Sequence, residues 1–480
     1  MLLEQLIKNI KPKKIIGKIK NINISEISIN SRTIKNNNLY IAINGEKFDG
    51  HSFIDEAIIN GAIAVITEKE FRHYKIPQII VNDTRKAMSQ IASEFYGNPK
   101  NKLKFIGVTG TNGKTSTSLF ISQILNSTGH KTACIGTLGI FVGDKIIENP
   151  LTTPDPLDFH KILKSLVEQD FEFVVMEVSA HAIALKKVCN INFEVGILTN
   201  ITQDHLDFFG DMENYAKVKR SFILSKKVKF ALVNADDQLT QKLLGKRKKL
   251  LTFGLHSPAD VFAINVEKNI RETKFVMNLL DNIFRIKISL VGEFNIYNTM
   301  AASLACLCLG LKIEEIISGL KTLTAPTGRF NIISLPENKT VVLDFAHTPD
   351  SLEKILHTTK ELCKGEVISL FGCGGDRDRS KRSQMGKISE AIADFTILTS
   401  DNPRFEKPEE ILCDIEKGFE SHNYLKITNR EEAIKKGLAI LKPNDILVIC
   451  GKAGELYQDI NGIKIPYSDH ETVMKFFNKI

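Results

Sequence analysis

Residues 108–116, Val-Thr-Gly-Thr-Asn-Gly-Lys-Thr-Ser, place two glycines and a Lys-Thr pair between an apolar run and a helical pattern. The run at 104–108 is typical of a buried strand, and residues 118–125 repeat apolar side chains at helical spacing towards Gly129. Strand, glycine-rich turn, Lys-Thr and helix form the context of a phosphate-binding loop, whose N–H groups point at an anion. The sequence therefore predicts a nucleoside triphosphate site.

Some of the loop residues are expected to bind phosphate and others to bind a metal ion. Gly110 and Gly113 allow the tight turn, the Lys114 ammonium reaches the outer phosphates, and the Thr115 hydroxyl can hold Mg²⁺. An ordinary strand-to-helix turn with a surface lysine is the alternative, but Gly-Lys-Thr-Ser in this context favours the phosphate site. The residues expected to contact ATP here are Gly110, Thr111, Asn112, Gly113, Lys114, Thr115 and Ser116.

Composition places the chain among multidomain globular proteins. Its 480 residues predict two to four domains, and 43% hydrophobic with 25% charged residues is typical of a soluble fold. A formal charge of +8 suits small anionic substrates at least as well as nucleic acid. The sequence carries no signature of a nucleic-acid-binding module, so we expect no nucleic acid partner.

The cysteines and the apolar stretches indicate a cellular compartment. The eight cysteines contain no Cys-x-x-Cys pair, which argues against a zinc site, and most lie in apolar runs, where free thiols suggest a reducing environment. The apolar stretch at the N-terminus is too short for a signal peptide, and the longest one, residues 300–311, is shorter than a membrane span. We therefore expect a cytoplasmic protein with no membrane span.

Alternating strand and helix patterns predict an α/β fold in three domains. Turn-rich segments at 97–99 and 325–328 separate residues 1–98, 99–327 and 328–480. Helices are expected at 54–60 and 84–96 and between the later strands, so the two larger sheets should be mostly parallel. The predicted strands are 39–43, 62–66, 104–108, 173–176, 195–198, 230–233, 340–343, 367–371, 395–398 and 446–450.

Polar residues follow two predicted strands of the central domain, where the ligands of open α/β sheets gather. Glu177 ends the run at 173–176 and can bind Mg²⁺ directly or through water, with capping of the next helix as the alternative. His205 follows the strand ending at Leu198 and can share a second cation site with Glu177, although a lone histidine is more often structural.

A helical segment at 215–222 adds a further candidate metal ligand. It carries Lys217 and Lys219 on different faces. A lysine ammonium has no lone pair and does not ligate a metal, whereas the carbamate formed with CO₂ supplies a carboxylate. A metal-binding lysine in this helix therefore requires carboxylation.

Together these segments resemble the Mur ligase family, whose members form amide bonds by way of an acyl phosphate. The resemblance covers nearly the whole chain and is carried by residues 109–115, 177–179 and 204–207 with the downstream lysine. It is strongest to the members that add meso-diaminopimelate to UDP-N-acetylmuramoyl-L-alanyl-D-glutamate in peptidoglycan precursor synthesis. The stretches shared with that branch are 30–32, 49–51, 152–154, 344–350, 371–378 and 401–404.

The resemblance implies a small UDP-sugar-binding α/β domain at the N-terminus, a central parallel-sheet ATPase domain, and a C-terminal Rossmann-like domain for the incoming amino acid. It makes Lys219, rather than Lys217, the carboxylated lysine. The metal ligands that it implies are Thr115, Glu177, His205 and the Lys219 carbamate.

The resemblance also implies how substrates are held. Asn295 and Asn298 would lie near the nucleoside, and Arg329 and His347 would approach ATP from the domain interface. The residues given catalytic roles are Lys114, Glu177, His205, Lys219, Arg329 and His347. The residues implied to hold the UDP-sugar and its dipeptide are Ile29, Ser31, Glu46, Lys47, Phe48, Thr152, Thr153, Ser179, Leu185 and Lys187.

The identity of the acceptor amino acid depends on charge. Meso-diaminopimelate differs from lysine by a second carboxylate at its far end, and the planar arginine fork pairs with both oxygens of such a group. Arg404 matches the family's diaminopimelate signature and Arg377 is a second candidate, whereas a surface arginine after a proline turn is the alternative. Glu455 would pair with the distal ammonium. The full acceptor set is Arg377, Asp401, Asn402, Pro403, Arg404, Gly451 and Glu455.

The chain departs from the family's pattern at a few positions. Asn30, Ala180, Lys187 and Phe209 stand where Asp, Ser, Arg and His are usual. Segment 451–455, Gly-Lys-Ala-Gly-Glu, lacks a usual histidine. These departures concern the local geometry, above all around Glu455, and leave the expected reaction type unchanged.

In the expected reaction, Mg²⁺ and Lys114 offset repulsion between the ATP γ-phosphate and the D-Glu carboxylate, and the free amine of diaminopimelate attacks the acyl phosphate.

The alternative functions are a lysine-adding ligase, which Arg404 disfavours, a folate-glutamylating ligase, which the Ser31 region disfavours, and a nucleotide-binding regulatory module. The base that deprotonates the amine is not identified, and His347 is a candidate. A monomer is expected.

Overall fold

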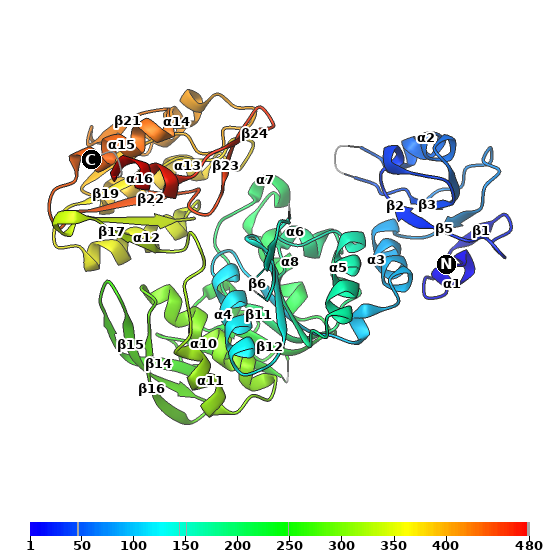
Figure 1. The fold of residues 1–480 in the computed structure, drawn as a ribbon, viewed down its shortest axis with the longest axis horizontal. Coiled ribbons are helices and arrows are strands. Elements are labelled where there is room, and N and C mark those ends of the chain that lie inside the picture. The colour runs from blue at the N-terminus through cyan, green and yellow to red at the C-terminus, as the bar shows by residue number, and fades with distance from the viewer. Residues whose placement is uncertain (46–47, 144, 150, 248, 478–480) are drawn as a thin grey trace. The chain divides into compact units, whose positions relative to one another are not determined.

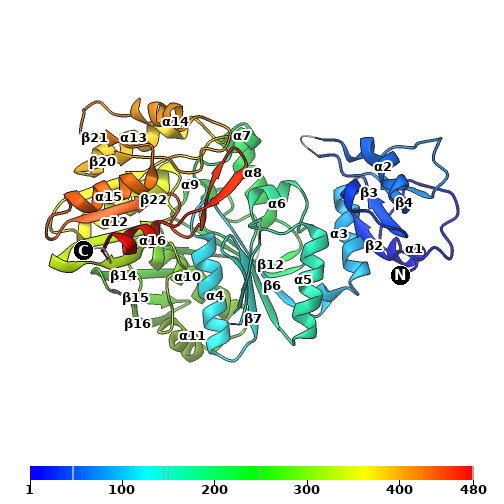
Figure 2. The same ribbon diagram turned by 45° about the horizontal axis from the view of Figure 1, so that its top comes forward.

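The computed structural model describes residues 1–45, 48–143, 145–149, 151–247 and 249–477. Within these residues the chain forms four sheets with covering helices (Figures 1 and 2). The chain divides into two compact units. One contains residues 1–108, 129–196 and 225–229, and the other contains residues 109–128, 197–224 and 230–480.

The N-terminal sheet has the strand order β1-β5-β4-β3-β2, with β1 antiparallel to β5 and the other pairs parallel. Successive side chains of a strand point to opposite faces. Accordingly Leu39 and Ile41 pack in one core with α1 (Leu3–Leu6) and α3 (Thr84–Phe95), whereas Tyr40 packs in another with α2 (Ile54–Ile59). The strands are β1 (Lys14–Ile16), β2 (Glu26–Ser28), β3 (Asn38–Ile41), β4 (Ala62–Thr67) and β5 (Gln78–Ile80).

The largest sheet has the order β16-β15-β14-β13-β12-β11-β6-β10-β7-β8-β9. The predicted runs at 104–108, 173–176, 195–198 and 230–233 are all strands of this sheet, and β10 is parallel to both β6 and β7. Its strands are β6 (Lys104–Thr109), β7 (Thr132–Gly136), β8 (Gly139–Val142), β9 (Lys145–Ile147), β10 (Phe173–Glu177), β11 (Phe193–Leu198), β12 (Val228–Asn234), β13 (Leu250–Gly254), β14 (Val261–Lys268), β15 (Thr273–Leu279) and β16 (Asn282–Ile288).

Antiparallel strands extend both ends of this order, and the sequence analysis did not predict them. β8 and β9 follow β7 as an antiparallel meander, and β14, β15 and β16 form another. These strands alternate buried and exposed side chains or are wholly exposed, so they lack the continuous apolar runs by which the parallel strands were recognised.

The C-terminal sheet has the order β17-β18-β22-β19-β20-β21 and is parallel except for β17. All four strands predicted here are present. Helices α12 (Pro349–Leu362), α13 (Lys381–Ile392) and α14 (Pro408–Glu416) pack on one face, and α15 (Arg430–Ile440) and α16 (Asp469–Phe477) pack on the other. The strands are β17 (Asn331–Ser334), β18 (Thr340–Asp344), β19 (Val367–Phe371), β20 (Phe395–Leu398), β21 (Tyr424–Lys426) and β22 (Ile446–Cys450), beside a hairpin of β23 (Tyr457–Ile460) and β24 (Ile463–Pro466).

Helices connect these strands in the α/β manner. The helix after the glycine loop begins at Lys114, four residues before the apolar periodicity that predicted it, because the Lys-Thr-Ser segment already has helical backbone. No helix in the described ranges is both long and apolar enough to cross a membrane. The remaining helices are α4 (Lys114–Ser127), α5 (Pro156–Glu168), α6 (Ala180–Ala184), α7 (Leu206–Phe209), α8 (Met212–Ile223), α9 (Gln238–Gln241), α10 (Glu293–Cys308) and α11 (Ile313–Leu320), with short 3₁₀ turns at Ser31–Thr33, Gly50–Phe53, Pro99–Asn101 and Pro336–Asn338.

A buried histidine in α5 makes stability depend on pH. His160 is fully buried, and neither ring nitrogen has a hydrogen-bond partner in the described structure. Burial, with a smaller effect of the Lys100 charge, lowers its pKa from 6.5 to about 3. The unfolded chain therefore binds this proton at a higher pH than the folded chain, and stability falls as the pH drops from about 6.5 towards 3.

We predict that His160→Leu, which removes the titrating ring and keeps an apolar side chain, loses less thermal stability than the wild type between pH 7.5 and pH 5. Thermal unfolding followed at both pH values measures the difference. His422→Leu, at an exposed histidine, is the control and should follow the wild type. Parallel pH profiles for His160→Leu and the wild type would show that this ring does not titrate on unfolding.

Candidate functional site

At two positions of the glycine loop between β6 and α4, neighbouring atoms leave no room for a side chain. Gly110 and Gly113 adopt φ angles of +149° and +83°. A Cβ atom at Gly110 would lie 1.9 Å from Thr199 Oγ1, and one at Gly113 would lie 2.7 Å from Asn298 Oδ1. The turn after β11 holds the loop, because the Asn112 N–H donates to Asn200 Oδ1 at 2.9 Å. Close packing from two sides therefore fixes the loop backbone.

Beside the loop lies a cavity of about 760 Å³, within the size range of small-molecule sites. Asn112, Gly113, Thr115 and Ser116 line it from the loop, and Asn298 lines it from α10. The cavity therefore adjoins the segment whose sequence predicted a phosphate site.

The two asparagines expected near the nucleoside have different positions. Asn298 lines the cavity and accepts a hydrogen bond from Thr117 Oγ1 at 3.1 Å. Asn295 is buried behind it: Asn298 Nδ2 donates to Asn295 Oδ1 at 3.3 Å, and Asn295 Nδ2 donates to the Val291 carbonyl at 2.8 Å. In this structure Asn295 orients Asn298 and does not line the cavity itself.

Arg329 reaches the cavity as expected. It donates to Thr115 Oγ1 at 3.4 Å, and its guanidinium lies 4.7 Å from the centre of the Phe345 ring. His347, expected at the same place, instead donates through Nδ1 to the Phe345 carbonyl, 2.8 Å away. Its own carbonyl accepts from Lys381 Nζ at 2.9 Å. Desolvation, followed by the Lys381 charge, lowers the pKa of His347 to about 4, so the imidazole is neutral and weakly basic at pH 7.

Two carboxylates of the cavity were missed by sequence reasoning. Asp350 accepts from Asn112 Nδ2 at 2.6 Å and joins the loop to the first turn of α12. Asp236, which follows β12, accepts from the Tyr297 hydroxyl at 2.7 Å and from the N–H groups of Leu255 and Ser257. Both had a signal, since Asp350 ends the motif at 344–350 and Asp236 lies at the carboxyl end of a buried strand.

Two lysines meet at one carbonyl of the loop. Lys114 Nζ donates to the Gly110 carbonyl at 3.0 Å and to the Thr111 carbonyl at 2.8 Å, and Lys219 Nζ donates to the Gly110 carbonyl at 2.6 Å. Burial, with a smaller effect of the Lys114 charge, holds the pKa of Lys219 well below its usual value. Lys217, on the same helix, is exposed. The structure thus separates the two lysines of α8 in the way the predicted faces require.

His205 lies beside a buried carboxylate that the sequence analysis did not single out. His205 Nε2 is 3.2 Å from Asp204 Oδ2. Burial alone would raise the pKa of Asp204, but the charges of His205, His347, Lys381 and Lys114 lower it to about 2. Asp204 is therefore an anion, held near the Lys114 and Lys381 ammonium groups.

Glu177 ends β10 as predicted, in register with Val108 of β6. It is buried, and its carboxylate accepts from the Thr137 N–H at 2.9 Å and the Thr137 hydroxyl at 3.2 Å. The capping alternative is wrong, because Ser179 caps α6 by accepting from the Ala182 N–H at 3.1 Å.

The residues implied to hold the dipeptide form one cluster around this strand end. Thr153 Oγ1 donates to the Glu177 carbonyl at 2.8 Å and lies 3.4 Å from Ser179 Oγ. Lys187 Nζ donates to the Thr153 carbonyl at 3.3 Å, and the Thr152 hydroxyl lies 3.1 Å from that of Thr137. Leu185 follows the end of α6.

Three of the residues implied for the UDP-sugar, Ile29, Ser31 and Phe48, lie in segments that connect strands of the N-terminal sheet. Ser31 follows β2 and donates to Glu56 Oε2 at 2.6 Å, so its hydroxyl is engaged. Ile29 and Phe48 are exposed, with 37% and 72% of their surface accessible. Glu46 and Lys47 lie outside the described residues.

The acceptor residues come together at the carboxyl end of the C-terminal sheet. Asn402 Nδ2 donates to Glu455 Oε2 at 2.8 Å, and a Cβ atom at Gly451 would lie 2.3 Å from Asp401 Oδ2. Lys452, which sequence reasoning missed, is completely buried and donates to Asn402 Oδ1 at 2.9 Å and Glu455 Oε2 at 2.8 Å. Its signal was its place inside segment 451–455.

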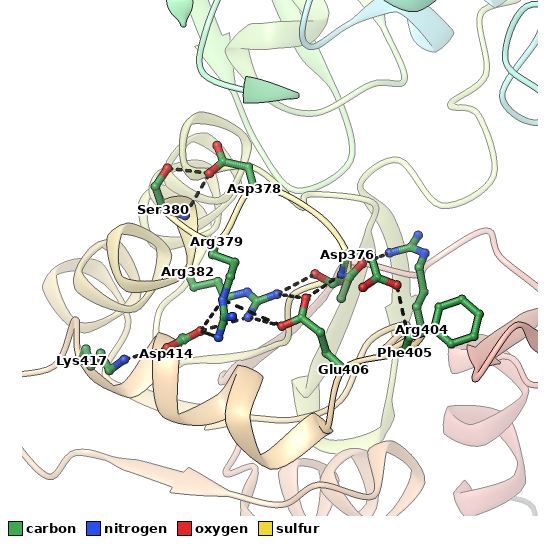
Figure 3. Close-up of polar contacts among 12 residues, drawn as sticks. Asp376, Asp378, Arg379, Ser380, Arg382, Arg404, Phe405, Glu406, Asp414 and Lys417 are labelled. Carbon is green, nitrogen blue, oxygen red and sulfur yellow. Dashed lines mark hydrogen bonds and ion pairs between the residues drawn. The ribbon is translucent and has the colours of Figure 1, made fainter. Parts of the chain in front are cut away.

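The two arginines of this site lie on adjoining loops. Arg404 NH1 donates to the Gly375 carbonyl at 2.7 Å, and a Cβ atom at Gly375 would lie 1.9 Å from the Pro403 carbonyl oxygen. Partial desolvation and the nearby Arg404 charge lower the pKa of Arg377. The two arginines therefore lie near each other, and Arg404 follows by two residues the Asn402 that bonds to Glu455. Figure 3 shows Arg404.

Three family models match successive parts of the chain. The Mur ligase family catalytic domain matches residues 23–96, the Mur ligase middle domain matches residues 108–306, and the Mur ligase glutamate ligase domain matches residues 328–453. Together they span all three regions described above.

Similar proteins extend over the full length. UDP-N-acetylmuramoyl-L-alanyl-D-glutamate--2,6-diaminopimelate ligase 1 of Clostridium acetobutylicum is 41% identical over 486 residues, covering 98% of this chain and 100% of the relative. The ligase of the same name from Clostridium tetani is 39% identical, with 100% of both chains covered.

Solved structures show the same architecture. One of a UDP-N-acetylmuramoyl-L-alanyl-D-glutamate--2,6-diaminopimelate ligase superposes with a TM-score of 0.70 and 29% identity, covering 100% of this chain and 99% of that one. MurF of Thermotoga maritima in complex with ADP superposes with a TM-score of 0.65 and 21% identity, covering 96% and 98%, and shares the fold. The family models and the full-length relatives show that this chain belongs to the Mur ligase family.

Proposed function

We propose that the protein is an ATP-dependent amide-bond ligase that adds meso-2,6-diaminopimelate to UDP-N-acetylmuramoyl-L-alanyl-D-glutamate through an acyl phosphate, in peptidoglycan precursor synthesis. The observation that carries the choice of acceptor is that Arg404 and Arg377 lie near each other on adjoining loops, and that Asn402, two residues before Arg404, bonds to Glu455. An acceptor with a carboxylate and an ammonium at its far end matches two cations next to a carboxylate. The names of the full-length relatives agree with it.

The chain's own residues supply most of the charge that the phosphoryl transfer needs. The loop N–H groups and Lys114 hold the outer phosphates, and Arg329 approaches the same cavity from the C-terminal side. Asn298 and, through it, Asn295 hold the nucleoside end. These groups offset the repulsion between a triphosphate and the substrate carboxylate, which is the main barrier to forming the acyl phosphate. In this proposal the peptide cluster of Thr152, Thr153, Ser179, Leu185 and Lys187 orients that carboxylate.

The proposed magnesium ligands are Thr115, Glu177, His205 and carboxylated Lys219. Carboxylate and hydroxyl oxygens are the ligands that Mg²⁺ prefers, and a carbamate on Lys219 adds one. Burial of the Lys219 amine against the Gly110 carbonyl supports this, because CO₂ adds to an unprotonated amine and a buried site disfavours the ammonium. Bound magnesium would supply Lewis-acid neutralisation of phosphate charge.

The remaining substrate and context assignments are part of the same proposal. Ile29, Ser31 and residues 46–48 hold the UDP-sugar, and Asp401, Pro403 and Gly451 shape the acceptor site. We place the protein in the cytoplasm as a monomer acting on small molecules, with domains at 1–98, 99–327 and 328–480. All eight cysteines are free, which supports a reducing compartment.

Because the weakly basic His347 is a poor proton acceptor, we assign it a structural place beside the cavity and do not name the base.

Acceptor choice gives the first test. With ATP, Mg²⁺ and the UDP-dipeptide, phosphate release should favour meso-diaminopimelate over L-lysine by on the order of 100-fold in kcat/KM. L-Lysine has no distal carboxylate, so the arginines lose the partner of a charge-assisted pair, which costs about 1.5–3 kcal/mol. Steady-state assays with each amino acid measure the ratio. Equal rates with lysine would overturn the acceptor assignment and leave the ligase assignment intact.

The acyl phosphate gives the second test. When the D-Glu side-chain carboxylate of the UDP-dipeptide carries ¹⁸O, one labelled oxygen should appear in the inorganic phosphate released in each turnover, because phosphate leaves with a carboxylate oxygen. Mass spectrometry of the phosphate measures this. Unlabelled phosphate during product formation contradicts an acyl phosphate route.

Carboxylation of Lys219 gives the third test. Lys219→Ala should lower kcat by on the order of 100-fold or more, since a metal ligand contributes several kcal/mol to charge stabilisation. Acetate or formate, entering the space of the lost side chain, should restore part of the activity. Lys217→Ala, at the exposed lysine of the same helix, should retain wild-type activity. Full activity of Lys219→Ala without added acid would contradict the carbamate proposal.

A further inference from the structure

A fully buried arginine that belongs to none of the expected sites lies next to the acceptor loops. Arg382, on α13, has no accessible side-chain surface. Its NH1 donates to Glu406 Oε2 at 2.9 Å and its NH2 donates to Glu406 Oε1 at 2.8 Å, a two-point fork. NH1 also donates to Asp414 Oδ2 at 3.0 Å. Figure 3 shows Arg382 between the two carboxylates.

Glu406 joins the two loops that carry the acceptor arginines. It lies two residues after Arg404, and its Oε1 accepts from the Asp376 N–H at 2.6 Å in the loop that carries Arg377. Arg382 NH2 is also 3.4 Å from the Gly374 carbonyl of that loop. One buried guanidinium and one carboxylate therefore connect residues 374–377 with residues 404–406.

These loops need such a connection. Asp376 and Arg404 both adopt left-handed backbone conformations, with φ of +52° and +50°. Such conformations cost a non-glycine residue about 1 kcal/mol or more and persist where the surroundings fix them. The loops also bring the positive charges of Arg377 and Arg404 close together, as the effect of Arg404 on Arg377 indicates, and like charges repel. Nearby carboxylates, such as Asp459 at 4.0 Å from Arg404 Nε, offset part of this repulsion.

We propose that Arg382 is a positioning residue for acceptor selection: its fork on Glu406 fixes the loops at the separation that lets Arg377 and Arg404 bind one carboxylate together. This inference rests on the proposed function, because it assumes that the two arginines hold the distal carboxylate of diaminopimelate. Arg382 itself is buried behind the loops, and its NH1 and NH2 donate to Glu406, Asp414 and the Gly374 carbonyl, whereas its Nε has no hydrogen-bond partner among the described residues. It therefore acts through Glu406 and the Asp376 N–H.

The test compares KM for diaminopimelate with KM for the other two substrates, because a positioning role changes the first constant alone and a general loss of stability does not. Arg382→Met should raise KM for diaminopimelate about tenfold or more and lower the preference for diaminopimelate over lysine. KM for ATP and for the UDP-dipeptide should stay within about twofold of the wild type, because the nucleotide cavity lies on other elements. Arg382→Lys should not restore KM, since a single ammonium lacks the planar fork.

Arg379→Met is the matched control. Arg379 is 61% exposed and donates to the same Asp414 oxygen, at 2.9 and 3.2 Å. Its Nε lies 3.9 Å from Glu406 Oε2, an ion pair without the two-point hydrogen bonding that Arg382 makes. Its loss removes one positive charge from the same cluster and should leave KM for diaminopimelate unchanged. Glu406→Gln keeps the shape of the side chain and removes its charge, and it should reproduce the kinetic change of Arg382→Met even where the latter folds poorly.

Two outcomes would overturn the inference. In the first, Arg382→Met and Glu406→Gln lower the thermal midpoint or kcat but leave KM for diaminopimelate and the lysine ratio at wild-type values, which assigns the cluster a structural role. In the second, Arg379→Met changes KM as much as Arg382→Met, which assigns the effect to net charge. A wild-type enzyme without preference for diaminopimelate is a different result, because it contradicts the proposed function directly.

Discussion

Two lysine side chains donate to one backbone carbonyl, that of Gly110, and much of the nucleotide site depends on this crowding. The loop backbone has no freedom to relieve it, because Thr199 and Asn298 occupy the space of any side chain at Gly110 and Gly113. The Lys114 ammonium and the Lys219 amine, whose burial disfavours the charged form, are therefore held close together before any anion arrives. A site preorganised in this way rearranges little when a triphosphate binds, so the free-energy cost of reorganisation is small.

The acceptor site uses the same principle with different groups. Arg377 and Arg404 are held near each other on strained loops, and the compensating carboxylates Glu406 and Asp414 lie behind them, around Arg382. Buried ion pairs contribute little net stability because their desolvation offsets their attraction, whereas they fix geometry strongly. Both sites thus hold two neighbouring basic side chains in place with polar contacts from the surrounding loops.

The sequence located the parallel strands and the loop closely, since continuous apolar runs and glycine spacing are local signals. It missed the antiparallel strands β14, β15 and β16, whose side chains alternate between buried and exposed. Within the sites, it named the residues that face substrates by resemblance but not their supports. Asp350, Lys452 and Arg382 make contacts with residues 24 to 238 positions away in the chain, and no local pattern encodes such a contact.

By itself the sequence determined an α/β chain with a phosphate loop, a strand-end glutamate and an arginine signature, because each of these is written in neighbouring residues. Only the tertiary structure decided which of the two α8 lysines is buried, that Ser179 rather than Glu177 caps α6, and that Asn295 lies behind Asn298. Burial and hydrogen-bond partners depend on which segments pack together. That packing minimises exposed apolar area and unpaired polar groups over the whole chain at once.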